Sequence, residues 1–149
     1  MSFTNDEANE IKLAGLMHDI GKIGISETIL NKPNNLNTND WVEVKRHPEI
    51  GYRILSSVNE FSQIANYVLE HHEKWDGTGY PKGLKGDEIS LQARIIAVAD
   101  SYDAMTKERT YRKALSKEEA IAELKKCSGT QFDPEVVKVF IENDLEIEY

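Results

Sequence analysis

The stretch FSQIANYVLEHH, residues 61–72, has the spacing of an amphipathic helix that ends in two adjacent histidines. The apolar side chains recur every three or four positions and therefore share one helical face; they are Phe61, Ile64, Ala65, Val68 and Leu69. His71 and His72 lie about 100° apart around the helix, at the edge of that face. Both imidazoles can therefore reach a single interior site.

The segments before this helix follow the same helical period. Residues 8–18 repeat with helical spacing, and Gly21 provides a stop. Residues 31–39, rich in asparagine, have the composition of a loop. Thr38 is the predicted N-cap of a helix that runs through residue 45, and Pro48 lies where the following helix begins.

The segments after residue 72 add a long irregular stretch and further helices. Residues 75–89 contain four glycines and a proline, and irregular segments of this length inside a domain are usually functional. The sequence then predicts helices that begin at Ser90, at the capping box of Ser116 and Glu119, and at Asp133 ahead of Pro134. Since no stretch alternates as a strand does, we expect an all-α fold of six to eight helices.

Composition narrows the class of protein. The chain has 149 residues, of which 40% are hydrophobic and 30% are charged, as in one soluble domain over residues 1–149. No apolar run approaches the roughly 20 residues that span a bilayer, and the single Cys127 excludes an intrachain disulfide. We therefore expect a cytoplasmic protein without a membrane segment. The net charge of −8 disfavours binding to DNA, and an anionic substrate would need a bound cation to attract it.

Histidines and aspartates form a candidate metal site, with these members: His18, Asp19, His47, His71, His72 and Asp100. Each residue taken alone has a plainer interpretation, as a hydrogen-bonded core histidine or a paired carboxylate. Together they favour a metal, because an ionised Asp100 within an apolar helix is costly unless it is paired or metal-bound. Imidazole with carboxylate suits Fe, Mn, Zn or Ni rather than Ca. Two metals bridged by a carboxylate can hydrolyse phosphate esters.

Three cationic residues are placed where they could bind phosphate. Lys22 follows the His18–Asp19 pair by one turn and could neutralise a phosphate oxygen. Arg109 and Arg112 could bind a second phosphate bidentately. Solvated surface charge is the alternative for all three residues.

These residues belong to an ordered set of motifs that resembles the HD-GYP family, a branch of the HD-domain metal-dependent phosphohydrolases. The motifs are HDIGKIGI at 18–25, LNKP at 30–33, KRHPEIGYRIL at 45–55, HHEKWDGTGYPKGLKGDEI at 71–89, ARIIAVADSYDAMT at 93–106, RTYRKAL at 109–115 and GTQFDPEVV at 129–137. The resemblance covers roughly residues 8–143, and seven motifs in the same order are far more specific than an isolated His-Asp pair.

The resemblance implies an HD-domain helical bundle and a bacterial signalling phosphodiesterase that hydrolyses cyclic di-GMP to pGpG or GMP. It implies two divalent metal ions, Fe or Mn first, with Zn, Ni or Mg as alternatives, bound by the candidate ligands with Asp19 bridging. By position, the substrate contacts would be Lys22, Gly79, Tyr80, Pro81, Arg109 and Arg112. Asp103 would orient Lys22 or water, which makes Asp19, Lys22 and Asp103 the predicted catalytic residues.

The chain departs from the family pattern on its N-terminal side. Family members carry a further helix that supplies another histidine, whereas only 17 residues precede His18 and none of them is histidine. We therefore expect an N-terminally short domain, either a fragment of a longer protein or a diverged short form, whose metal site lacks one ligand. Such a domain could form a homodimer that covers exposed apolar surface. The alternatives are a weak or inactive module that binds nucleotide or a partner, such as a GGDEF diguanylate cyclase or receiver domain, and a phosphohydrolase for another phosphodiester.

Overall fold

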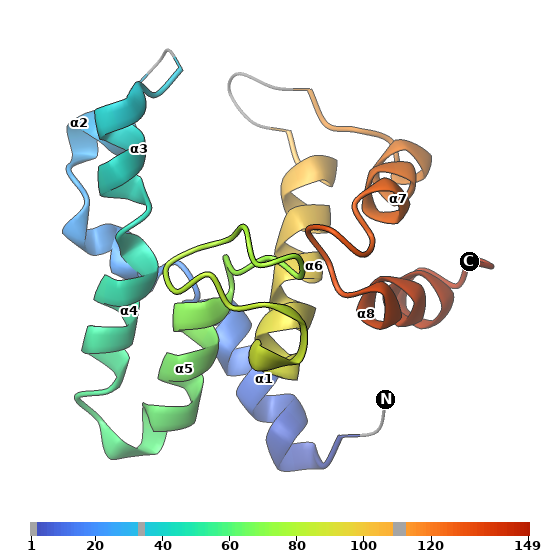
Figure 1. The fold of residues 1–149 in the computed structure, drawn as a ribbon, viewed down its shortest axis with the longest axis horizontal. Helices are drawn as coiled ribbons and strands as arrows, with labels where there is room; N and C mark the ends of the chain where they lie inside the picture. Colours follow the sequence, from blue (N-terminus) through green and yellow to red (C-terminus); the bar gives the residue numbers. More distant parts are fainter. Residues whose placement is uncertain (1–2, 33–34, 109–112) are drawn as a thin grey trace. The chain divides into compact units, whose positions relative to one another are not determined.

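The computed structural model describes residues 3–32, 35–108 and 113–149, and this part of the chain is helical (Figure 1). It contains eight α-helices with short 3₁₀ segments and a π-helical turn, and its only β-type pairing is an isolated bridge between Ser128 and Phe132. The expected all-α fold is therefore confirmed. Among the described helices, none is long and apolar enough to cross a membrane.

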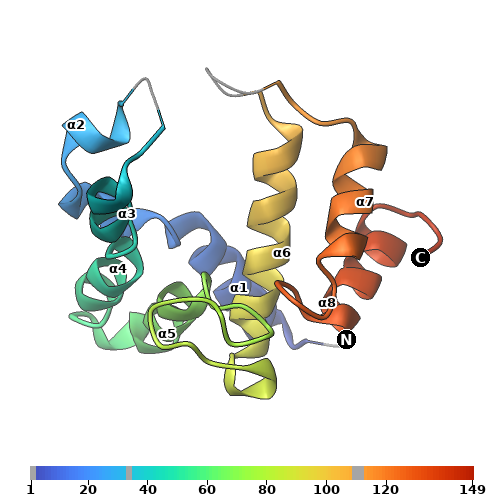
Figure 2. The same ribbon diagram turned by 45° about the horizontal axis from the view of Figure 1, so that its top comes forward.

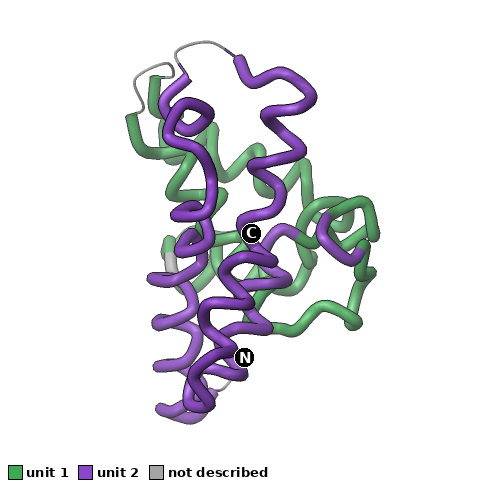
Figure 3. The backbone as a smooth tube through the Cα atoms, turned by 90° about the vertical axis from the view of Figure 1, so that its left-hand side faces the viewer, with its two compact units in different colours: residues 1, 73–79, 83–149 green, residues 2–72, 80–82 purple. Residues whose placement is uncertain are grey.

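The chain divides into two compact units (Figure 3). The N-terminal unit contains the chain up to His72 together with Tyr80–Lys82. The C-terminal unit contains Glu73–Gly79 and Gly83–Tyr149. The irregular segment after His72 therefore contributes residues to both units.

The N-terminal unit is built on helix α5, which packs against α1 and α4. Its elements are α1 (Asn5–Met17), η1 (Ile20–Gly24), α2 (Glu27–Leu30), α3 (Thr38–Val44), α4 (His47–Leu55), η2 (Asn59–Phe61) and α5 (Ser62–Glu70). The apolar face predicted for residues 61–69 supplies four of its buried side chains, Ile64, Ala65, Val68 and Leu69. These residues position the C-terminal end of α5, where His71 and His72 follow.

Side-chain caps begin the first three α-helices of this unit, α1, α2 and α3. Thr4 and Glu7 form a capping box at α1, with Thr4 Oγ1 accepting a hydrogen bond from the Glu7 backbone amide. The predicted cap of α3 is wrong by one residue, because Asn37 rather than Thr38 makes the cap. Asn37 Oδ1 accepts from the Asp40 amide while the Asp40 carboxylate accepts from the Asn37 amide, so the two side chains together satisfy two backbone donors at the start of the helix.

Gly21 allows η1 to lie directly against α4, and Gly51 allows α4 to lie close to α5. A Cβ atom at Gly21 would lie 1.8 Å from the His47 carbonyl oxygen and 2.6 Å from the Gly51 amide nitrogen. A Cβ atom at Gly51 would lie 3.0 Å from Val68 Cγ1. The backbone after Asp19 therefore approaches the start of α4 more closely than any residue with a side chain would permit.

The C-terminal unit has its own apolar core between α6 (Leu91–Thr106), α7 (Lys117–Lys126) and α8 (Pro134–Val139), which Figure 2 shows together. The core residues are Val98, Ile121, Leu124, Phe132, Val136, Val137 and Ile141. The 3₁₀ turn η3 (Gly86–Glu88) precedes α6, and the π-helical segment η4 (Phe140–Asp144) follows α8. The predicted starts of α7 and α8 are confirmed, since Ser116 and Glu119 form a capping box and Asp133 accepts from the Glu135 amide.

Backbone hydrogen bonds order the irregular segment of this unit. The amides of Trp75 and Asp76 donate to the carbonyl oxygens of Gln131 and Thr130 at 3.1 and 2.9 Å. The buried Glu73 carboxylate accepts from the Leu84 amide at 3.0 Å. The glycine-rich stretch is therefore an ordered loop with its own hydrogen bonds.

Candidate metal centre

The four histidines all lie at helix ends of the N-terminal unit. His18 follows α1 as its C-cap, His47 is the first residue of α4, and His71 follows α5 as its C-cap, with His72 next to it. His47 and His71 are almost completely buried, at 1% and 2% exposure. Helix packing therefore gathers residues from three separate stretches of sequence.

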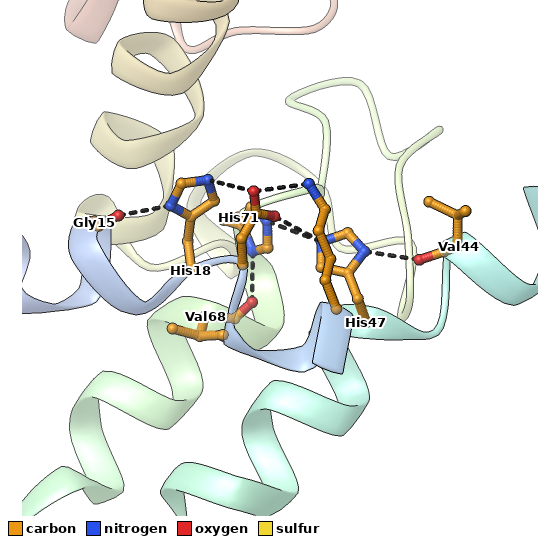
Figure 4. Close-up of polar contacts among 8 residues, drawn as sticks. Gly15, His18, Val44, His47, Val68 and His71 are labelled. Atoms are coloured by element: carbon orange, nitrogen blue, oxygen red, sulfur yellow. Dashed lines mark hydrogen bonds and ion pairs between the residues drawn. The ribbon is translucent and has the colours of Figure 1, made fainter. Parts of the chain in front are cut away.

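Each of His18, His47 and His71 is held by a backbone carbonyl three residues before it (Figure 4). The Nδ1···O distances are 2.6 Å from His18 to Gly15, 2.7 Å from His47 to Val44 and 2.6 Å from His71 to Val68. A carbonyl oxygen can only accept, so Nδ1 carries the hydrogen in every case. In the neutral ring, Nε2 is then the atom with the lone pair, as in a metal ligand whose other nitrogen is fixed by a hydrogen bond.

The lone pairs converge on a small volume. Ligand atoms of His47, His71 and His72 all lie within 4.8 Å of one another, and His47 Nε2 lies 3.4 Å from His71 Nε2. Two neutral rings with both Nδ1 atoms protonated cannot form a hydrogen bond between their Nε2 atoms, because neither Nε2 carries a hydrogen. A cation between the two nitrogens removes the repulsion of facing lone pairs, so these residues fit a metal that prefers imidazole ligands.

Burial keeps two of these imidazoles neutral. It lowers the pKa of His71 to about 4, although the hydrogen bond to Val68 acts in the opposite direction. It also lowers the pKa of His47, against the hydrogen bond to Val44 and the Asp19 charge. Both rings are therefore unprotonated near pH 7, which is the form that binds metal.

A carboxylate and an ammonium group adjoin the histidines. Asp19 Oδ2 lies 3.5 Å from His18 Nε2 and 2.7 Å from Lys22 Nζ, and Asp19 Oδ1 lies 3.6 Å from His47 Nε2. Burial opposes ionisation of Asp19, but the Lys22 hydrogen bond and the charges of its neighbours outweigh it, so that the pKa is lowered. Asp19 is thus a half-exposed anion placed between two histidines.

Tyr80 lies beside His72 in the same unit. Its ring stacks on the His72 ring with centroids 5.0 Å apart and planes 20° apart, and its amide donates to the His72 carbonyl oxygen at 3.2 Å. Lys45 Nζ lies 5.3 Å from the Tyr80 ring centroid. Burial, with a smaller effect of the Asp19 charge, raises the pKa of Tyr80 to about 12, so its hydroxyl keeps its proton.

The remaining predicted site residues are divided between the two units and the part of the chain that is not described. Pro81 follows Tyr80 in the N-terminal unit, while Gly79, Asp100 and Asp103 belong to the C-terminal unit. Asp100 is half-buried on α6. Asp103 pairs with Lys107 Nζ at 2.7 Å. Arg109 and Arg112 lie outside the described residues, and the roles given to all these residues stay predictions.

Sequence reasoning missed two kinds of contributor to this site. The carbonyls of Gly15, Val44 and Val68 belong to no motif, although a histidine at a helix end is within reach of the carbonyl three residues earlier. Lys45 is not among the predicted site residues, because its contact with the Tyr80 ring is between positions 35 residues apart in the sequence. Its presence two residues before His47 in KRHPEIGYRIL is the available sequence signal.

Known proteins similar to this chain include several phosphodiesterases. The chain is 47% identical over 140 residues to a cyclic di-GMP phosphodiesterase of Thermotoga maritima, in a match covering 93% of this chain and 38% of that protein. It is 41% identical to the cyclic di-GMP phosphodiesterase response regulator RpfG of Xanthomonas campestris, over 99% of this chain and 40% of that protein. The chain thus spans about two-fifths of the length of these relatives.

A solved structure shares the fold, and a family match gives the classification. A crystal structure of a cyclic GMP-AMP specific phosphodiesterase of Vibrio cholerae aligns with a TM-score of 0.73 at 23% identity, covering 97% of this chain and 40% of that one. Residues 1–136 match the HD domain family. Together with the His18–Asp19 pair in its helical setting, this match shows that the chain belongs to the HD domain family.

Proposed function

We propose that this chain is the catalytic domain of a metal-dependent phosphodiesterase that hydrolyses cyclic di-GMP to pGpG or GMP. The observation that carries the proposal is the pair of buried imidazoles whose Nε2 atoms face each other at 3.4 Å while both Nδ1 atoms are bound to carbonyls. The match to cyclic di-GMP phosphodiesterases at 41–47% identity supports the substrate class. Related Vibrio cholerae phosphodiesterases specific for 3′3′-cGAMP make that cyclic dinucleotide the second substrate to test.

The proposed ligands are His18, Asp19, His47, His71, His72 and Asp100, and the proposed cofactor is a pair of divalent ions. Iron or manganese suits imidazole with carboxylate best, with zinc, nickel and magnesium as alternatives. When bound, such ions neutralise phosphate oxygens and lower the pKa of an attacking water. Carbonyl-held imidazoles orient the ligand atoms before any ion arrives, which reduces the cost of ordering them.

Lys22 is the proposed contact to the scissile phosphate. Its ammonium group donates to Asp19 and is 42% exposed as a side chain. An ammonium has three N–H donors, so it can bond to Asp19 and a phosphate oxygen at the same time. Asp19 thereby positions the positive charge that stabilises the charge developing on phosphate.

The test is hydrolysis and metal content measured on the same preparations. The chain is purified without oxygen or chelator, its Fe and Mn are counted by mass spectrometry, and cyclic di-GMP and 3′3′-cGAMP turnover is followed by chromatography. Asp19→Asn keeps the shape of the side chain and removes its charge, while Asp6→Asn makes the same change on the exposed start of α1. We expect turnover to fall at least about 100-fold in Asp19→Asn and to be unchanged in Asp6→Asn.

Two outcomes contradict the proposal. Nucleotide binding without turnover in the presence of excess Mn²⁺ or Fe²⁺ identifies the alternative, a module that binds nucleotide or a partner. Hydrolysis of other phosphodiesters but of neither cyclic dinucleotide identifies a different substrate for the same chemistry.

The proposed setting is a cytoplasmic signalling protein, in which a GGDEF cyclase domain or a receiver domain is the expected partner. A homodimer remains a separate proposal. Leu16 in α1 and Ile23 in η1 are apolar side chains with 77% and 83% exposure, which a second copy would cover. Light scattering across micromolar concentrations tests it, and a strictly monomeric species contradicts it.

A further inference from the structure

Aromatic rings surround His72. The His72 ring lies 5.0 Å from His47 in an edge-to-face contact, 4.1 Å from His71 in a tilted contact, and 5.0 Å from Tyr80 in a stacked contact. Tyr80 is also joined to His72 through the backbone, by the amide–carbonyl hydrogen bond at 3.2 Å. The orientation of the His72 ring is therefore constrained by its packing as well as by its own backbone.

Lys45 contacts the Tyr80 ring that stacks on His72. Its Nζ lies 5.3 Å from the Tyr80 ring centroid, within the range in which a cation is attracted to an aromatic face. Lys45 is the C-cap of α3, and His47 begins α4 two residues later. The same short connection thus supplies His47 to one side of His72 and a cation to the tyrosine that stacks on His72.

We propose that Lys45 and the Tyr80 ring are positioning residues that hold His72 in its metal-ligating orientation. Tyr80 acts through its ring, and its hydroxyl is dispensable for this role. Lys45 acts by fixing the ring of Tyr80. The inference rests on the proposed metal site and adds to it a structural reason for an aromatic ring at this place in the loop.

The direction in which metal affinity changes when Lys45 is replaced distinguishes a positioning role from a purely electrostatic one. A positive charge near a divalent cation repels it, so removing the charge alone would strengthen metal binding. Removing a positioning residue has the opposite effect, because His72 then spends less time in the binding orientation. Weaker metal binding in a Lys45→Met variant is therefore the distinguishing result.

The experiment measures Mn²⁺ affinity by competition with a chelator, using Mn²⁺ alone as the probe. We expect Tyr80→Leu to weaken Mn²⁺ binding about 10-fold or more, as for other partners that orient metal ligands, and Tyr80→Phe to bind as the wild type does. We expect Lys45→Met to weaken it about 2–5-fold, the range of an exposed cation–aromatic contact, and Lys45→Arg to restore it. Lys12→Met, an exposed lysine of α1, is the matched control and should have no effect.

A second measurement does not require metal. In NMR spectra of the metal-free protein, the ring current of Tyr80 shifts the His72 ring protons, and the shift should persist in Tyr80→Phe and disappear in Tyr80→Leu. A folded Tyr80→Leu variant with wild-type Mn²⁺ affinity, or a Lys45→Met variant that binds Mn²⁺ more tightly, overturns the inference. A wild-type protein that binds no Mn²⁺ or Fe²⁺ instead refutes the proposed function, so the two failures are distinguishable.

Discussion

Replacing Gly21 with alanine should separate η1 from α4 and thereby disturb the metal centre. The added Cβ atom would lie 1.8 Å from the His47 carbonyl oxygen, whereas real Cβ atoms essentially never come within 3.0 Å of a neighbour. The two backbone segments must therefore move apart by more than 1 Å. No side chain can rotate away to relieve the overlap, because the two closest atoms are backbone atoms of His47 and Gly51.

The unfolding free energy lost in Gly21→Ala can be estimated from the energetics of overpacking. Forcing one extra methyl-sized group into a packed interior costs about 1–3 kcal/mol and sometimes more. Since the contact here is backbone against backbone, we expect about 3 kcal/mol of lost unfolding free energy, at the upper end of that range. The same displacement moves Asp19 relative to His47, whose Nε2 lies 3.6 Å from Asp19 Oδ1, so Mn²⁺ affinity should fall as well.

Urea denaturation of the metal-free protein measures the loss of unfolding free energy, and competition with a chelator measures the loss of Mn²⁺ affinity. Gly15→Ala is the matched control, because a Cβ atom at Gly15, within α1, meets nothing within 4 Å. The unfolding free energy of Gly15→Ala should rise by about 0.5–1 kcal/mol, the usual difference between alanine and glycine inside a helix. If Gly21→Ala unfolds at the wild-type urea concentration and keeps wild-type Mn²⁺ affinity, the close packing of η1 on α4 is refuted.

Three further predictions concern the site itself. His71→Gln should lose Mn²⁺ binding, measured by competition, since glutamine cannot replace an imidazole lone pair at that position. Acidification of the metal-free protein should reduce its unfolding free energy. His71 has a pKa of about 4 when folded and about 6.5 when unfolded. The folded protein therefore favours the neutral ring, and this contribution to the unfolding free energy is complete above pH 6.5 and is lost as the pH falls to 4. The loss is about 3 kcal/mol; urea titrations at pH 7 and pH 4 measure it, and an equal loss in His71→Gln would contradict this assignment. Lys22→Met should lower turnover of cyclic di-GMP about 100-fold while Mn²⁺ stays bound, with Lys12→Met unaffected; equal losses in both variants would exclude a direct phosphate contact.

Much of the fold was predictable because local sequence signals agree with the packing. The apolar spacing of residues 61–69 predicts the buried face of α5, and Ser116 with Glu119 predicts the start of α7. The short helix α2 was not predicted, since four residues offer too little periodicity to distinguish a helical turn from a loop. The cap of α3 was misplaced by one residue because both Asn37 and Thr38 are good capping residues, and the reciprocal bond to Asp40 selects Asn37.

The candidate site was predictable in its members but only partly in its geometry. The adjacency of His71 and His72 at the end of a helix indicates a shared site from the sequence alone. The 3.4 Å approach of His47 to His71 depends on how α4 packs against α5, where Gly51 meets Val68, and the position of Asp19 depends on how Gly21 packs against α4. Such contacts join distant parts of the chain, so periodicity and capping carry no information about them.

The acidic net charge does not prevent the binding of an anionic substrate at this site. The chain carries a formal charge of −8, but in physiological salt an exposed charge is largely screened beyond about 8 Å. Within that distance of Asp19 the structure places the Lys22 ammonium, 2.7 Å away. The imidazoles of His47 and His71 are neutral near pH 7, since burial lowers the pKa of both, so they bind a cation without repelling it. Lys22 is paired with Asp19, so the metal ions proposed for this site would supply the local positive charge, and a distant acidic surface would then be compatible with an anionic substrate.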